Sequence, residues 1–69
     1  MKNVHAELAR RAGVSPQFVS DLRARRKRAS PDTAIRLEEA ASGIGMDVTK
    51  EDWANPQWSK HPWFRGDPK

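Results

Sequence analysis

The sequence contains no cysteine and only two histidines, His5 and His61. Disulfide bonds are therefore excluded, and a zinc site, which is usually built from Cys and His ligands, is not expected. No run approaches the ~20 apolar residues that cross a bilayer, and no apolar stretch near Met1 resembles a signal peptide. These absences predict a soluble, cytoplasmic protein that binds no metal and does not enter a membrane.

The sequence also lacks the residue sets that carry out catalysis. It shows no Ser-His-Asp or Cys-His arrangement and no glycine-rich loop of the kind that binds phosphate groups. The acidic residues are scattered, in positions typical of helix caps and solvated faces. We therefore predict that the protein is not an enzyme and has no cofactor.

Charge is distributed unevenly along the 69 residues. Residues 1–28 contain eight lysines and arginines against two acids, a net charge of +6, whereas residues 29–69 contain five against seven, a net charge of −2. A basic half beside an acidic half is typical of a surface that binds a polyanion, although a solvated charged face gives the same pattern. Charge alone leaves these two interpretations equally open.

The first predicted helix spans residues 4–12. Its apolar residues, Val4, Leu8, Ala9 and Ala12, recur at helical spacing and share one face. Asn3 can cap the start of this helix. Gly13 follows directly and suits the left-handed conformation that ends many helices, so a tight turn is expected there.

Two Ser-Pro pairs predict the starts of the next two helices, at Pro16 and Pro31. A serine hydroxyl accepts a hydrogen bond from a free amide of the first turn, and proline at the first helical position loses no hydrogen bond. Thr49 and Asp52 resemble a capping box and predict a short fourth helical turn that carries Trp53.

The second predicted helix has one apolar face and one polar face. Val19 and Leu22 lie on one side at 100° per residue, and the opposite side carries small or polar residues, namely Gln17, Ser20, Asp21 and Ala24. A helix that enters a DNA groove about 12 Å wide needs short side chains that reach base edges. This face favours a role in nucleic-acid binding.

Residues 57–69, which we call the tail, combine loop-forming residues with aromatic ones. Proline, glycine and charged residues indicate a loop, whereas Trp58, Trp63 and Phe64 indicate contact with other groups. Such a tail is expected to pack on the rest of the chain, on a second copy or on a partner.

The stretch HAELARRAGVSPQFVSDL resembles the helix-turn-helix of the lambda-repressor-like superfamily. The matching positions are a leucine and an alanine in the first helix, the turn glycine and two apolar anchors in the second helix: Leu8, Ala9, Gly13, Val19 and Leu22. The segments SPDTAIRLEEAASG and DVTKEDWANP resemble the following helix and last turn of short Cro-type or YdaS-type phage and prophage repressors. The resemblance covers residues 5–56. It implies an all-α fold, a small helix-turn-helix domain of about four short helices over residues 1–56, with an aromatic C-terminal tail at residues 57–69.

The sequence departs from the family pattern at two places. Arg25 stands where relatives usually have glycine after the second helix, so we expect the exit to be reshaped or the helix to be extended. Relatives usually carry another helix before the motif, and we expect the tail aromatics to cover the surface which that helix covers. We assign Trp53, Trp58, Trp63 and Phe64 to packing of the tail or of a dimer.

The resemblance implies that the second helix lies in the major groove of double-stranded DNA. The implied base contacts are Gln17, Ser20 and Asp21, although Asp21 has a stronger alternative as an ion-pair partner of Arg25 four residues on. The implied phosphate contacts are Ser15, Arg23, Arg25, Arg26, Lys27 and Arg28, with Arg10 and Arg11 as weaker candidates.

The function implied by the resemblance is sequence-specific DNA binding by a transcriptional regulator. It is that of a phage or prophage repressor that acts as a homodimer in the cytoplasm of a bacterial host cell. The alternative is a helix-turn-helix fold that binds another protein through its aromatic tail, as an antitoxin or a phage-encoded inhibitor such as an anti-CRISPR would. A DNA-binding repressor needs the tail aromatics for its own core or dimer, whereas a protein-binding inhibitor would leave them exposed as anchors.

Overall fold

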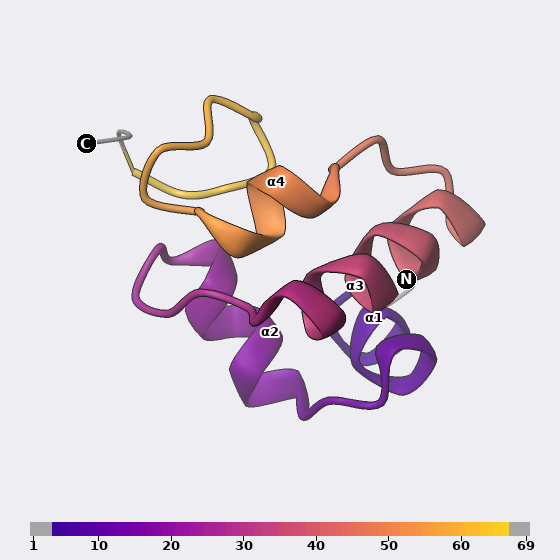
Figure 1. Cartoon of the computed structure of the whole chain (residues 1–69). Helices are drawn as coiled ribbons and strands as arrows, with labels where there is room; N and C mark the ends of the chain where they lie inside the picture. Colours follow the sequence, from indigo (N-terminus) through magenta and orange to yellow (C-terminus); the bar gives the residue numbers. More distant parts are fainter. Residues whose placement is uncertain (1–3, 67–69) are drawn as a thin grey trace.

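Four helices make up the regular structure of the chain. The computed structural model describes residues 4–66, in which α1 spans Val4–Ala12, α2 Pro16–Arg23, α3 Pro31–Gly43 and α4 Lys50–Ala54 (Figure 1). No strand occurs among these described residues. The predicted all-α fold with four short helices is confirmed. The predicted cap at Asn3 lies outside the described residues.

The helix starts follow the local capping signals. The hydroxyl oxygen of Ser15 accepts from the backbone N–H of Phe18 at 3.1 Å, and that of Ser30 accepts from Thr33 at 3.4 Å. At α4, Thr49 and Asp52 form a reciprocal capping box. Each cap satisfies an amide that the helix itself leaves free, so these starts are set within a few residues of sequence.

The end of α2 is a Schellman turn built on an arginine. The N–H of Arg25 donates to the carbonyl oxygen of Leu22 at 3.0 Å, and the N–H of Arg26 donates to that of Asp21 at 2.9 Å. Arg25 has a φ of 63°, where a non-glycine residue costs roughly 1–2 kcal/mol. The helix is not extended; instead, Arg25 itself adopts the left-handed conformation that Gly13, with a φ of 74°, adopts after α1.

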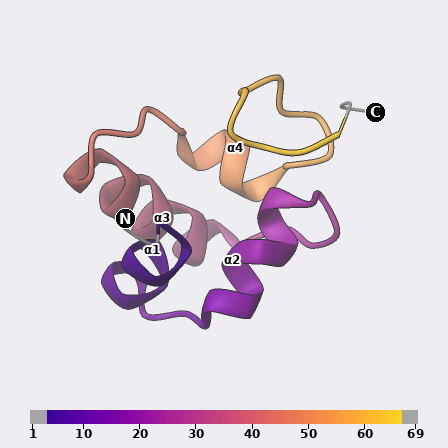
Figure 2. The same cartoon turned by 180° about the vertical axis from the view of Figure 1, so that it is seen from behind.

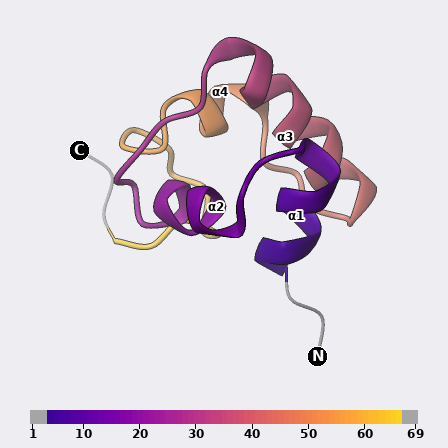
Figure 3. The same cartoon turned by 90° about the horizontal axis from the view of Figure 1, so that it is seen from below.

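The hydrophobic core lies between the helices, with α3 packed against both α1 and α4, and α1 against α2. Figure 3 shows α1 and α2 diverging from the turn that joins them, with α3 beside α1. Trp53 is the largest fully buried side chain, and it extends from α4 into the core. Its carbonyl oxygen accepts from the N–H of Ala29 at 3.1 Å, which ties the loop before α3 to α4. The core consists mainly of small aliphatic residues around these helices: Leu8, Ala9, Ala12, Val19, Leu22, Ala29, Ala34, Leu37, Ala40, Ala41 and Val48.

The tail folds back over α4 and the end of α2 (Figures 1 and 2). Phe64 is buried, and its ring stands edge-on to Trp53 with centroids 5.6 Å apart. The ring of Trp63 meets Trp53 at 5.1 Å and reaches His5 of α1 at 5.9 Å. The tail therefore completes the core of its own chain through these two aromatic residues.

Trp58 differs from the other aromatic residues assigned to packing, because 63% of it is exposed. It lies in a turn closed by a hydrogen bond of 3.0 Å from its N–H to the carbonyl oxygen of Asn55. Trp63 and Phe64, rather than Trp58, provide the rings that pack against Trp53. A contact of Trp58 with a second chain stays a prediction.

Candidate nucleic-acid interface

Helix α2 turns its apolar side inward and leaves Gln17 at the surface. Val19 and Leu22 are fully buried in the core. On the opposite side Gln17 is exposed and Ser20 is half-buried. Two of the three predicted base contacts thus stand where an approaching molecule can reach them.

Asp21, the third predicted base contact, lies differently. It is only 7% exposed, and its carboxylate oxygen accepts from the Gln17 side-chain amide at 3.2 Å. The predicted alternative, an ion pair with Arg25, is wrong in its partner, because Asp21 pairs with Arg26 at 3.5 Å and Lys27 at 3.4 Å. The left-handed turn directs Arg25 toward the tail and brings the following two residues back over the end of α2.

Arg25 binds the tail and Pro56, the residue directly before it. Its guanidinium group donates to the carbonyl oxygens of Pro56, of Ser59 at 2.6 Å and of Arg65 at 2.8 Å. The same group lies 5.6 Å from the centre of the Phe64 ring, within the range of a cation–π contact. Sequence reasoning placed Arg25 on DNA phosphates, whereas the structure directs its donors to backbone oxygens 31 to 40 residues away.

Arg23 also faces the tail. Its Nε donates to the backbone carbonyl oxygen of Trp63 at 2.9 Å. Its guanidinium group lies 5.3 Å from the centre of the Trp63 ring. In return, the N–H of Arg65 donates to the carbonyl oxygen of Arg23 at 2.8 Å. Arg23 and Arg25 together fasten the tail to the end of α2, so we call these two residues the arginine clamp.

Substitution of Arg25 by glycine compares the stabilisation from the Arg25 hydrogen bonds with the strain of the left-handed backbone at this residue. Glycine relieves the left-handed strain, worth roughly 1–2 kcal/mol, but loses hydrogen bonds from a charged donor worth about 1.5–3 kcal/mol each. The three lost hydrogen bonds outweigh the relieved strain, so we expect Arg25→Gly to lower the free energy of unfolding by about 2.5 kcal/mol or more, measured by urea denaturation.

The matched variant is Arg25→Ala, which loses the same hydrogen bonds and keeps the strained backbone. It should be less stable than Arg25→Gly by about 1 kcal/mol. An Arg25→Gly protein more stable than the wild type would show that the contacts of Arg25 contribute less than the strain of its backbone, and an Arg25→Ala protein as stable as the wild type would show that they contribute nothing.

The predicted phosphate contacts outside the clamp remain accessible. The side chains of Arg26 and Lys27 are 70% and 59% exposed even though each pairs with Asp21. Arg28 and Ser15 are also exposed. These residues flank the two ends of α2, which is the arrangement needed to hold a helix in a groove by its phosphate walls.

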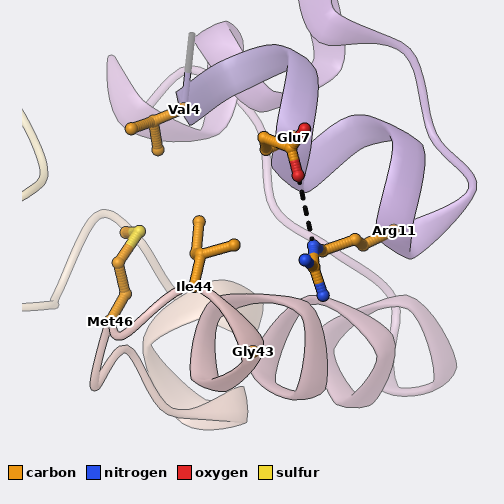
Figure 4. Close-up of a pocket in the computed structure, with 6 residues that line it drawn as sticks. All are labelled: Val4, Glu7, Arg11, Gly43, Ile44 and Met46. Carbon is orange, nitrogen blue, oxygen red and sulfur yellow. Dashed lines mark hydrogen bonds and ion pairs between the residues drawn. The ribbon is translucent and has the colours of Figure 1, made fainter. Parts of the chain in front are cut away.

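The two arginines of α1 share one carboxylate partner, Glu7. Glu7 accepts from Arg10 at 2.8 Å and from Arg11 at 3.3 Å, and these hydrogen bonds hold the pKa of Glu7 below its usual value. Figure 4 shows Arg11 reaching from α1 toward Gly43 at the end of α3, where a Cβ atom would come within 2.8 Å of its guanidinium. Arg11 therefore faces α3, and Glu7 offsets one of the two arginine charges, which leaves a net charge of +1 on this helix.

The two histidines, His5 in α1 and His61 in the tail, were given no role by the sequence. Burial lowers the pKa of His5, and the positive charges of Arg23 and Arg65 lower it further, so its surroundings favour the neutral imidazole. His61 Nε2 lies 2.6 Å from a carboxylate oxygen of Asp47, and this hydrogen bond lowers the pKa of Asp47. The contact joins the tail to the loop before α4 across 14 residues, and no local sequence pattern signals it.

The sequence of α1 to α3 matches the model of a protein family. A helix-turn-helix family model matches residues 4–44, which is more than half of the chain. The protein belongs to the helix-turn-helix family. The predicted membership in the lambda-repressor-like superfamily is confirmed, and this family consists of DNA-binding regulatory domains rather than enzymes. No curated protein and no solved structure matches the chain significantly.

The helix-turn-helix comprises α1, the turn at Gly13 and α2, and α2 occupies the position of the recognition helix. None of the helices in residues 4–66 has the length and apolar character needed to cross a membrane. Over the same residues, no three histidine or acidic side chains gather in a group that could hold a metal ion.

Proposed function

We propose that the protein is a transcriptional regulator of the phage or prophage repressor type, which binds specific sites in double-stranded DNA as a homodimer. The observation that carries the proposal is the coincidence of the recognition helix with an exposed polar face and accessible cations at its C-terminal end. Base readout requires the exposed polar face, and phosphate binding requires the accessible cations.

Gln17 and Ser20 are the proposed base-reading residues. The Gln17 amide keeps its oxygen and one N–H free after donating to Asp21, and these two groups match the paired acceptor and donor of adenine in the major groove. Ser20 can donate or accept and suits several bases.

The proposed phosphate contacts are Ser15, Arg26, Lys27 and Arg28. Their cations lie after the helix end, so they fix the register of α2 on the duplex without reading sequence. Arg23 and Arg25 are left out of this proposed set because the clamp uses their donors.

A dimer follows from the size of the interface. A single eight-residue recognition helix reads only a few base pairs, and paired half-sites about 34 Å apart are the usual solution. The alternative function as a protein-binding inhibitor receives less support, because Trp63 and Phe64 serve the core of their own chain.

The test begins with selection of preferred duplexes from a random library, followed by affinity measurements on single-base variants. Gln17→Ala should abolish preference at one base pair of each half-site, a loss of about 1–3 kcal/mol there. Arg28→Ala is the matched control, because loss of a phosphate contact weakens binding to all duplexes alike. Equal weakening of every duplex by both variants would contradict the assignment of the base-reading face.

A further inference from the structure

Asp21 is the one buried charged residue among residues 4–66, and it lies on the recognition helix. A carboxylate on a DNA-binding surface is repelled by phosphates, so its presence there costs affinity, and its contacts with neighbouring groups must offset that cost. Its contacts show which groups those are.

The carboxylate of Asp21 joins residues from both parts of the proposed interface. One oxygen accepts from the amide of Gln17, the proposed base-reading residue, one turn earlier on α2. The carboxylate also pairs with Arg26 and Lys27, two of the proposed phosphate contacts. Among residues 4–66, no other acidic side chain forms a hydrogen bond or an ion pair with these three residues.

These contacts have different strengths. The Gln17 bond holds an exposed side chain to a buried one, which fixes which end of the amide faces outward. The two ion pairs are long and their cations are mostly exposed, so phosphates can displace Asp21 from them. Asp21 therefore orients Gln17 through the shortest of these contacts, at 3.2 Å, and holds the cations through ion pairs of 3.4 and 3.5 Å that phosphates can replace.

We propose that Asp21 is a positioning residue that favours specific over non-specific DNA binding, an inference that rests on the proposed function. It orients the Gln17 amide for base reading. It also competes with phosphates for Arg26 and Lys27, which weakens binding to any duplex that offers no base contact in return. Asp21 itself touches no base.

Two substitutions separate the two effects. Asp21→Asn keeps the shape and an oxygen that accepts from Gln17, but removes the charge that holds the cations. Affinity for a duplex of unrelated sequence at 50 mM salt should rise about 2- to 10-fold, while preference at the Gln17-dependent base pair stays within about twofold. Asp21→Ala removes the acceptor as well, and should reduce that preference by about 5-fold or more, toward the level of Gln17→Ala.

Glu39→Gln is the control for charge alone. Glu39 is an exposed acid on α3, so its neutralisation removes the same charge away from the contacts of Asp21 and should change affinity for the unrelated duplex less than twofold. In the double variant Gln17→Ala, Asp21→Ala, base preference should fall no further than in Gln17→Ala, because both changes remove the same interaction.

The outcomes distinguish this inference from the proposed function. If the wild type prefers no duplex sequence, the proposed function fails. If the wild type discriminates and Asp21→Ala discriminates equally well, the positioning role fails while the function stands. Should Asp21→Ala not fold, as judged by its thermal melt, Asp21→Asn decides: an affinity for unrelated DNA no higher than that of Glu39→Gln would overturn the inference.

Discussion

Replacement of Phe64 by alanine is expected to lower the melting temperature by about 15 °C or more. Phe64 is 5% exposed and packs edge-on against both Trp53 and Trp63. Its loss therefore opens a cavity beside these two rings. Phenylalanine-to-alanine changes in cores cost about 3–5 kcal/mol, and each kcal/mol shifts the melting temperature of a domain this small by about 4–8 °C. Small domains have a margin of about 5 kcal/mol, so the variant should be close to unfolding.

Trp58→Ala is the matched control, since it removes a larger aromatic ring from the same tail. Because 63% of Trp58 is exposed, its loss should change the free energy of unfolding by no more than about 0.5 kcal/mol. Thermal melts followed by circular dichroism measure both variants. Equal melting temperatures for Phe64→Ala and the wild type would show that the tail does not form part of the core in solution.

The second large effect concerns salt. Affinity for the selected duplex should fall roughly 10³-fold between 50 and 200 mM salt, because six phosphate contacts release their condensed counterions. Three cations on each of two chains, Arg26, Lys27 and Arg28, provide these six contacts, and the clamp withholds Arg23 and Arg25 from the count.

The size of the salt effect also reports on the dimer. A single chain with three phosphate contacts would lose only about 40-fold over the same range. Sedimentation at micromolar concentration should show two chains, and Lys50→Ala, which changes an exposed lysine on α4, should leave the salt slope unchanged. A flat salt response would remove DNA from the proposed function, and a 40-fold response from a monomer would remove the dimer.

The helices and the helix-turn-helix could be predicted because their signals are local. The caps at Ser15 and Ser30 act on amides three residues away, and the turn at Gly13 depends on the backbone freedom of one residue. The outward direction of Gln17 follows from helical periodicity, since Val19 and Leu22 must face the core.

The surroundings of Asp21 could not be read from periodicity. A helical wheel places it beside Gln17 on the outer face, but the wheel does not include the chain that follows the helix. The left-handed turn folds Arg26 and Lys27 back over Asp21, which buries the carboxylate and pairs it with cations. A rule for pairs four residues apart names Arg25 instead, because it assumes that the helix continues.

The sequence by itself determined the four helices, the polar face of α2 and the membership in the helix-turn-helix family, since caps, turns and periodicity act over a few residues. Only the tertiary structure decided which cations are free and which aromatic residues are buried. Arg25 meets its acceptors 31 to 40 residues away, and composition does not distinguish Phe64 from Trp58. Both the free cations and the buried rings depend on the path of the tail. That path is set by the packing of Phe64 against Trp53 and by the tail backbone oxygens that accept from Arg25 at the end of α2.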